Sequence, residues 1–386
     1  MGASFPVVLV VLVAVLGSLY QLVLTPVLTI SGVLRQVDPL NNEGCRFVPE
    51  LEGCEKMVHL PQSNLLYLAC SRIASRPYWM PPSGHLNASS KALDDHIAMY
   101  NLDTGKVTRL AIESDYIARR GLQVHGMDVV ASTSDPTRLF VYAVNHREPL
   151  TGDPALTGAD SAIEVFSTTA GSSSMEYIST VEDSLILTPN DIAGFPDGKS
   201  FYFTNDHSVK LGMYRKLETF MGLASTNVGY CHVDHGCKVV ARNIRGANGI
   251  AKGRNETVFV ASLGGGIYVM NQQADHTLSH RDTIPSGGLP IDNISVDQDG
   301  AVWAAMFPRG IEIVKRFADM SKDAASSAWR FSKNVDWSSN QKYVAERFFE
   351  DAGPIAQGTT TVVHLPERRE LYLTSAVATH MTICKI

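Results

Sequence analysis

The sequence predicts an all-β fold, a six-bladed β-propeller, with an apolar helix ahead of it. Three observations support this: a turn-and-strand phrase occurs six times, polar residues lie just upstream of each copy, and Phe5 to Leu34 is uncharged. The clearest copy is PDGKSFYFTN at residues 196–205, where turn-forming Pro, Asp and Gly precede a run that suits a half-buried strand. Copies spaced roughly 45–75 residues apart fit four-stranded blades with insertions.

The uncharged N-terminal stretch predicts a membrane-crossing helix, because a bilayer requires about 20 apolar residues. A cleaved signal peptide, with an apolar core of about 7–15 residues, is the competing interpretation. The cleavage signature VLG at residues 15–17 is weak, and no basic residue precedes the apolar core. We therefore expect residues 1–36 to form a retained signal-anchor or transmembrane segment and residues 37–386 to form a single propeller domain.

The six copies predict six hairpins, each joining the two innermost strands of a blade. The turns begin at Pro61, Asp135, Pro196, Gly253, Asp297 and Pro366. Every turn is followed by a run of aromatic, aliphatic and β-branched residues, such as Leu139-Phe140-Val141-Tyr142. This arrangement places the first strand of each blade just upstream of its turn.

Polar residues occur at the expected starts of those first strands. They are Glu55, His125, Asn190 with Asp191, Asn248, Asp292 with Asn293, and Thr359 with Thr360. Equivalent strand starts converge on the central channel of a propeller, and several of these residues lie within apolar runs. Because a buried carboxylate is costly unless it is paired or metal-bound, we favour an axial metal site with oxygen ligands over a channel that is merely hydrogen-bonded.

Charge and cysteine content restrict the class of protein. Charged residues make up 19% of the chain and the formal net charge is −6, so we expect no nucleic-acid partner. The six cysteines are even in number and lack Cys-x-x-Cys spacing, which indicates a disulfide framework made in the secretory pathway.

Fifteen cysteine pairings are possible from sequence alone. A bond between Cys45 and Cys384 would join the first and last blades. A Cys231–Cys237 bond would close a local loop and would leave Cys54 with Cys70. Glycosylation sequons begin at Asn87 and Asn255 in turn-like settings, whereas we expect the sequon at Asn293 to be buried and unmodified.

Six short motifs follow one another along the chain: VHG at 124–126, VNH at 144–146, PNDI at 189–192, TNDH at 204–207, ANGI at 247–250 and DNISVD at 292–297. In this order, with the terminal cysteines, they resemble the serum paraoxonase/arylesterase family. That family comprises calcium-dependent lactonases and esterases with a six-bladed propeller. The resemblance runs from about Cys45 to Cys384 and covers the whole globular part, although the intervening sequence is distant.

The resemblance implies a catalytic calcium held by Glu55, Asn190, Asn248, Asp292 and Asn293. Five protein oxygens plus water suit the six to eight positions that Ca²⁺ accepts. The resemblance also implies that His125 is a general base and that His146 is its partner, a role that suits the pKa of imidazole. Asp206 and His207 match a family motif, and we expect these two residues to have a structural role.

Two positions depart from the family pattern. The second, structural calcium of the family uses an acidic residue directly after the ligand glutamate, and here that position is Lys56. Asp191 would belong to the second site, which Lys56 makes doubtful, so we expect one calcium ion per chain, with two as the alternative. Phe307 replaces a histidine common in the family's pocket, which predicts a more apolar wall.

These features predict a calcium-dependent hydrolase of lactones and aryl esters, membrane-anchored with its propeller in the lumen or outside the cell, or else secreted. Its substrate would be a small apolar lactone or ester, attacked by water that a histidine activates. The alternatives are a propeller enzyme that performs a non-hydrolytic step, such as cyclisation of an apolar metabolite, and a non-catalytic propeller that calcium stabilises.

Overall fold

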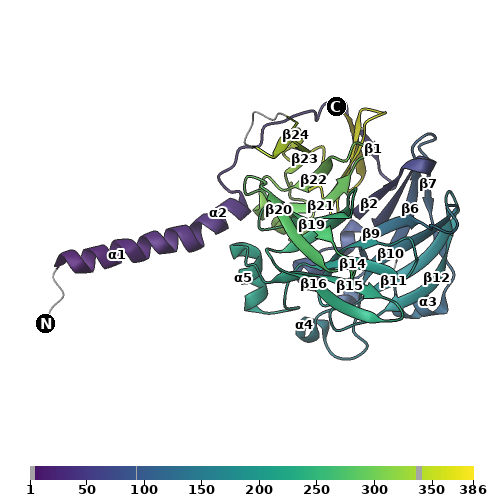
Figure 1. The fold of residues 1–386 in the computed structure, drawn as a ribbon, viewed down its shortest axis with the longest axis horizontal. Helices are drawn as coiled ribbons and strands as arrows, with labels where there is room; N and C mark the ends of the chain where they lie inside the picture. The colour runs from purple at the N-terminus through teal and green to yellow at the C-terminus, as the bar shows by residue number, and fades with distance from the viewer. Residues whose placement is uncertain (1–4, 93, 336–340) are drawn as a thin grey trace.

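The computed structural model describes residues 5–92, 94–335 and 341–386, and residues 1–4 of the predicted N-terminal segment lie outside this part. Six antiparallel sheets form a β-propeller, and a long helix projects from it (Figure 1). The predicted fold class is therefore confirmed. The first blade consists of β2 (Cys54–Leu60), β3 (Leu65–Cys70), β6 (His96–Asn101) and β7 (Val107–Arg109). The second consists of β9 (Val124–Ala131), β10 (Arg138–Arg147), β11 (Asp160–Thr169) and β12 (Ser174–Val181). The third consists of β13 (Pro189–Gly194), β14 (Ser200–Asn205), β15 (Thr226–His232) and β16 (Gly236–Ile244).

The other three blades complete the ring. The fourth blade consists of β17 (Ala247–Lys252), β18 (Thr257–Ser262), β19 (Gly266–Gln272) and β20 (Leu278–Ile284). The fifth consists of β21 (Ile291–Val296), β22 (Val302–Met306), β23 (Ser326–Lys333) and β24 (Tyr343–Asp351). The sixth consists of β25 (Thr361–Leu365), β26 (Glu370–Thr374), β27 (Met381–Lys385) and β1 (Arg46–Val48). The short strand β8 (Ala111–Ile112) pairs in parallel with β12, and β4 (Trp79–Met80) forms a small hairpin with β5 (His85–Leu86).

The predicted turns join the first two strands of every blade. The first is the 3₁₀ turn Pro61–Ser63 between β2 and β3, and the last lies between β25 and β26. The six first strands contact one another in sequence around the axis, from β2 through β9, β13, β17 and β21 to β25 and back to β2. Apolar side chains of adjacent blades pack together between these sheets, as Tyr202 of one blade does with Val258 and Val260 of the next.

The ring is closed by strands from both ends of the globular part. β1 pairs with β27 as the outermost strand of the sixth blade, and a disulfide joins Cys45 to Cys384 across 339 positions of sequence. Two further disulfides, Cys54–Cys70 and Cys231–Cys237, link directly opposed residues of neighbouring strands. The pairing expected from the sequence is confirmed, and it is consistent with passage through the secretory pathway.

The N-terminal stretch forms one helical rod of α1 (Phe5–Leu19), a π-helical turn (Tyr20–Leu24) and α2 (Thr25–Ser31). Pro26 has no N–H to donate to the preceding turn, which accounts for the irregular hydrogen bonding ahead of it. The span Val7–Ser31 is long and apolar enough to cross a membrane, and its most apolar window makes no buried contact with the propeller. The predicted apolar helix is confirmed, and its insertion in a membrane stays a prediction.

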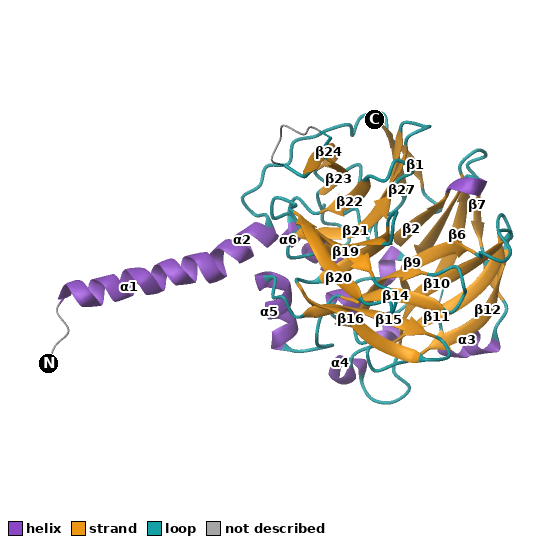
Figure 2. Cartoon of the chain, in the orientation of Figure 1, coloured by secondary structure: helices purple, strands orange, loops and turns teal. Residues whose placement is uncertain are grey.

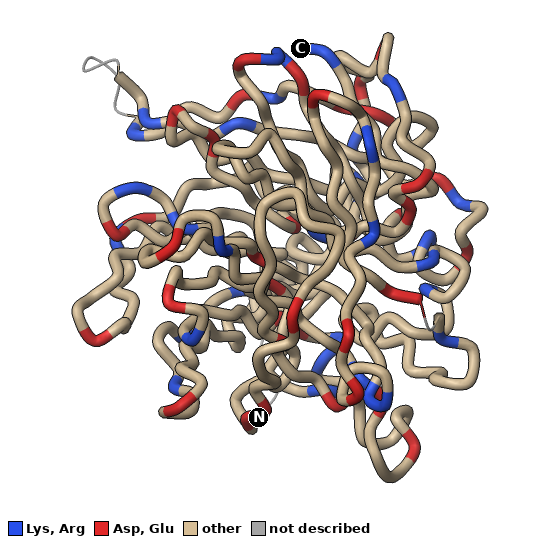
Figure 3. Tube along the Cα trace, turned by 90° about the vertical axis from the view of Figure 1, so that its right-hand side faces the viewer, with Lys and Arg blue, Asp and Glu red and all other residues tan. Residues whose placement is uncertain are grey.

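The far end of this rod rests on the propeller beside α5 (Met213–Met221) and α6 (Gly310–Ala318) (Figure 2). Gly32 ends α2 with a φ of +64°, and a Cβ there would lie 2.3 Å from the carbonyl oxygen of Pro308. The remaining helices are α3 (Asp115–Arg120) and α4 (Pro154–Thr157). Basic and acidic positions are interspersed along the outer turns (Figure 3).

Removing the closing disulfide should destabilise the protein more than removing a local one. Replacing Cys45 and Cys384 by Ser opens a loop of 339 residues, which is worth roughly 6 kcal/mol in the chain-entropy relation. The matched control replaces Cys231 and Cys237, whose separation of six residues is worth roughly 2 kcal/mol. Chemical denaturation measures both values, and equal losses in the two variants would contradict the ring-closure argument.

Candidate active site

The polar residues at the strand starts occupy one structural position. Glu55, His125, Asn190, Asn248 and Asp292 are each the second residue of their strand, in β2, β9, β13, β17 and β21. In all five strands the pairing register shifts at or next to this residue. Because a β-bulge bends a strand and re-aims its side chains, these shifts turn the five polar groups toward the axis.

Glycines bring these strand starts close together. A Cβ at Gly126 would lie 2.1 Å from the backbone oxygen of Asn190, and one at Gly249 would lie 2.6 Å from the Cα of Asn293. Any other residue at either position would push two blades apart. The glycine of the VHG motif and that of the ANGI motif therefore set the spacing of the polar cluster.

Within the cluster, side chains from different blades hydrogen-bond to one another. Asn293 Nδ2 donates to Glu55 Oε1 at 3.0 Å, and Asn190 Nδ2 lies 3.3 Å from His125 Nε2. Thr360 and Thr361 both donate to the backbone oxygen of Glu55 at 2.8 Å, so the sixth blade holds Glu55 in place without joining the ligand set.

Several buried oxygens of the cluster have no hydrogen-bond partner among the residues that the structure describes. They are Glu55 Oε2, Asn190 Oδ1, Asn248 Oδ1 and Asp191 Oδ1. Unpaired buried acceptors are costly, and converging oxygens of carboxylate and amide groups are the donors that a hard cation prefers. The residues present thus fit an oxygen-ligated metal ion.

The electrostatics of the cluster also fit a bound cation. Burial raises the pKa of Glu55, and burial together with the neighbouring Glu55 and Asp191 carboxylates raises the pKa of Asp292 well above its usual range. A cation would relieve that repulsion. Over the described ranges, no group of three or more His, Cys, Asp and Glu side chains could hold a metal, so an ion bound here would need amide oxygens among its ligands.

Lys56 lies directly below this cluster. Its Nζ is 2.5 Å from Asp191 Oδ2 and 3.5 Å from Asn293 Oδ1, and both Lys56 and Asp191 are buried. The backbone N–H of Ile250 donates to the same Asp191 oxygen at 2.9 Å. On its other side Lys56 lines a tunnel of about 330 Å³ with residues of all six inner strands. Its ammonium therefore separates the oxygen cluster from that tunnel.

The two histidines lie above the cluster with their rings adjacent. Their centroids are 5.4 Å apart, and His146 Nδ1 is 2.9 Å from Ser161 Oγ. Burial lowers the pKa of His125 to about 3 and lowers that of His146 well below its usual range, so both imidazoles are neutral at pH 7. His125 Nδ1 and His146 Nε2 are buried and without a partner among the described residues. His125 Nε2 is 3.8 Å from Glu55 Oε1, which connects the histidines to the oxygen cluster.

The mouth above the histidines is covered by residues that the repeat did not identify. The β4–β5 hairpin extends from the first blade, and Trp79 Nε1 donates to the backbone oxygen of His146 at 3.0 Å. Buried Arg76 donates to the backbone oxygens of Gly53 and Ala376 and acts by its charge on Glu55. These residues lie in a non-repetitive insertion between β3 and β6, where periodicity carries no signal.

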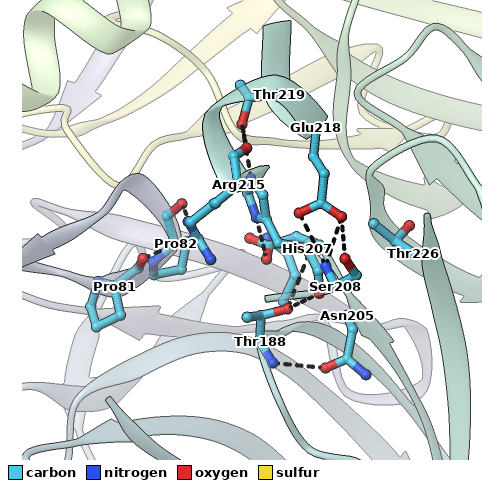
Figure 4. Close-up of polar contacts among 12 residues, drawn as sticks. Pro81, Pro82, Thr188, Asn205, His207, Ser208, Arg215, Glu218, Thr219 and Thr226 are labelled. Carbon is cyan, nitrogen blue, oxygen red and sulfur yellow. Dashed lines mark hydrogen bonds and ion pairs between the residues drawn. The ribbon is translucent and has the colours of Figure 1, made fainter. Parts of the chain in front are cut away.

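The TNDH motif places Asp206 and His207 under α5, where they hydrogen-bond to each other and to that helix. His207 Nδ1 is 2.7 Å from Asp206 Oδ1, and its Nε2 is 2.8 Å from Thr219 Oγ1 of α5 (Figure 4). Both residues are buried beneath that helix, in keeping with the structural role expected for them. Phe307 is buried in an apolar cluster with Met80 and Ile313, so this side of the mouth is apolar.

The family model and the curated relatives that match this chain point to the same family. The arylesterase family model matches residues 85–382. The chain is 26% identical over 335 residues to serum paraoxonase/arylesterase 2 of Gallus gallus, covering 84% of this chain and 85% of that one. It is 26% identical over 333 residues to serum paraoxonase/arylesterase 1 of Mus musculus, covering 85% and 86%. The crystal structure of the major Malassezia sympodialis allergen is similar in fold, with a TM-score of 0.51, 13% identity and coverage of 86% and 92%.

The buried Lys56–Asp191 pair should be strongly coupled in stability. Lys56→Met or Asp191→Asn leaves one charge buried and unpaired, and each should lower the free energy of unfolding by about 3–5 kcal/mol. The double variant should lose much less than the sum of the two, as urea denaturation at fixed free calcium would measure. Lys199→Met, which breaks an exposed contact of 2.7 Å with Asp234, is the control and should change little. Additive losses in the double variant would mean that the two buried charges do not interact.

Proposed function

Because the chain belongs to the arylesterase family, we propose that it hydrolyses small apolar carboxylic esters, with lactones and aryl esters as its substrates. The observation that carries this proposal is the axial cluster, in which unpaired buried oxygens lie beside two neutral histidines under an apolar-walled mouth. A cation held by those oxygens would stabilise an oxyanion, and a neutral histidine can activate water, which are the two requirements of ester hydrolysis.

The metal in this proposal is calcium, held by Glu55, Asn190, Asn248, Asp292 and Asn293. When bound there, calcium would polarise an ester carbonyl and stabilise the negative charge that develops on its oxygen. The bulged strand starts fix the positions of these ligands before any ion binds. The two carboxylates among them balance the charge of a divalent cation.

We also propose that the site holds one calcium ion per chain. A second ion about 4 Å from the Lys56 ammonium would be repelled by roughly 8 kcal/mol at an effective dielectric constant near 20. Asp191, the carboxylate that would bind it, already pairs with Lys56 at 2.5 Å. The ammonium thus takes the place of a second cation in holding Asp191 and the strand that donates to it.

His125 is the proposed general base. Its neutral imidazole takes a proton from water as the water oxygen bonds to the ester carbonyl carbon. The acyl C–O bond then breaks, and the leaving oxygen receives the proton from the histidinium. The products are an acid and a phenol or alcohol, or a single hydroxy acid when the substrate is a lactone. His146, hydrogen-bonded to Ser161, orients the neighbouring ring.

The location proposed for the enzyme follows from its N-terminal rod. A retained anchor would place the propeller on the lumenal or extracellular side, where disulfides persist. Asn87 and Asn255 are exposed and are the proposed glycosylation sites, whereas Asn293 is buried within the cluster. A panel of γ- and δ-lactones and phenyl acetate, with and without chelator, tests the activity. Thermal stabilisation by calcium with no hydrolysis of any substrate would favour a non-catalytic propeller instead.

Calcium removal should lower both activity and melting temperature, because binding to the native state alone stabilises by about 2.7 kcal/mol at a hundredfold excess over Kd. Glu55→Gln and Asp292→Asn should weaken calcium binding, and Asp299→Asn, in an exposed turn of the same blade, is the control. Metal analysis of dialysed protein should give one calcium per chain, rising in Lys56→Asp. Two per chain in the wild type would contradict the role of Lys56.

Replacing the base should remove hydrolysis without unfolding the protein. His125→Gln should lower kcat/KM on the order of 10²–10⁴-fold while calcium binding and the melting temperature are kept. His235→Gln, which changes an exposed histidine, provides the control. Activity comparable to wild type in His125→Gln would assign proton transfer to another group.

A further inference from the structure

The mouth of the candidate site is closed in this structure. The cavity between the β4–β5 hairpin and the third blade measures about 20 Å³ and is lined by Pro81, Pro82, His146, Asp206 and Arg215, among others. That volume holds about one water molecule, whereas small-molecule sites typically have about 300–1,000 Å³. No ester reaches His146 unless part of this lining moves.

The hairpin is attached differently at its base and at its turn. At the base, Trp79 and Met80 are both buried, and Met80 packs with Phe307 of the fifth blade. At the turn, Arg215 Nη2 donates to the backbone oxygens of Pro81 at 3.1 Å and of Pro82 at 2.6 Å (Figure 4). The base is thus held by packing and by the hydrogen bond from Trp79 to His146, and the turn is held by hydrogen bonds from one guanidinium.

Arg215 itself is held firmly by α5. Its Nη1 donates to the backbone oxygen of Val209 at 3.3 Å. Glu218, one turn further along the helix, accepts from Ser208 N at 3.0 Å and from the hydroxyls of Ser208 and Ser225 at 2.5 Å. The helix is therefore fixed to the third blade. Of the two surfaces that meet at the mouth, the hairpin turn is the one that is free to leave.

Burying a guanidinium among carbonyl groups is expensive, which argues against a passive role for Arg215. The side chain is buried, and its hydrogen bonds go to three backbone oxygens. Within the turn, the Pro81 carbonyl also accepts from Gly84 N at 3.0 Å, so this oxygen keeps a partner when the guanidinium leaves. An interaction of this kind fastens two surfaces that must also separate.

We propose that Arg215 is a gating residue, whose hydrogen bonds to Pro81 and Pro82 hold the β4–β5 hairpin closed over the mouth and whose release admits the ester. The entry of a substrate rests on the proposed hydrolase function, whereas the latch itself does not. Arg215 touches no reacting atom in this scheme. It sets how often, and for how large an ester, the site is open.

Hydrogen exchange of the full-length, calcium-loaded protein tests the latch directly. In Arg215→Met, the backbone amides of residues 79, 80 and 83–86 should exchange about tenfold faster or more, since a hydrogen bond to a charged group contributes at least that factor. Arg215→Lys keeps a positive charge near Asp206 but lacks the planar fork that reaches both carbonyls, so it should give an intermediate rate. Lys216→Met removes an exposed charge from the same helix and should leave the exchange unchanged.

Kinetics on the same variants test the gate. The ratio of kcat/KM for a bulky aryl ester to that for phenyl acetate should rise several-fold in Arg215→Met, because opening costs less. Unchanged exchange at the hairpin would overturn the latch, and faster exchange with an unchanged ratio would overturn the gating role. Faster exchange in a protein that hydrolyses neither ester would support the latch and refute the hydrolase proposal. If Arg215→Met does not fold, the Arg215→Lys exchange rate decides.

Discussion

The balance of charge on the propeller axis constrains the rest of this structure. Ring closure brings the starts of six inner strands to one line, and in this chain those starts carry three carboxylates, several amides and a histidine, all buried. Buried carboxylates with unpaired oxygens and raised pKa values do not form a stable core by themselves. The axis thus fits a cation, and the bulges, the close-approach glycines and the closing disulfide hold in place the strand starts that would bind it.

Lys56 supplies part of that balance from within the chain. Its ammonium is tethered and lies against Asp191, so one carboxylate is neutralised without any ion from solution. A tethered cation cannot dissociate, whereas a bound metal ion exchanges with its surroundings. The Asp191 carboxylate is therefore neutralised permanently by Lys56. The carboxylates of Glu55 and Asp292 have no such tethered partner, and their site fits a metal ion that can exchange. Polarising an ester requires an open coordination position, which a tethered ammonium cannot provide.

The repeat could be recognised in the sequence because each hairpin is local. Turn residues such as those at Pro196 specify their own backbone, and the aromatic-rich strand that follows needs no distant partner to be identified. Placing Glu55 or Asp292 at a strand start therefore located the axial cluster. The register shifts at these residues carry no comparable signal, since a bulge depends on the partner strand. The insertion with Trp79, Arg76 and the β4–β5 hairpin has no period, and Arg215 binds carbonyl groups that any residue possesses.

The repeated inner strands and the non-repetitive segments also carry different tasks in this protein. The groups that would bind metal and activate water lie on inner strands, where a change in Gly126 or Asn190 would disturb the packing of two blades. The groups that cover the mouth lie on an insertion and on α5, outside the ring of inner strands. We expect substitutions at Arg215 or at the hairpin turn to alter access to the mouth, whereas Arg76 of the same insertion acts by its charge on Glu55 and so belongs to the axis as well. Because α2 rests on α5, the apolar N-terminal rod ends against the helix that carries Arg215, so the seating of the rod and the proposed gate depend on the same helix.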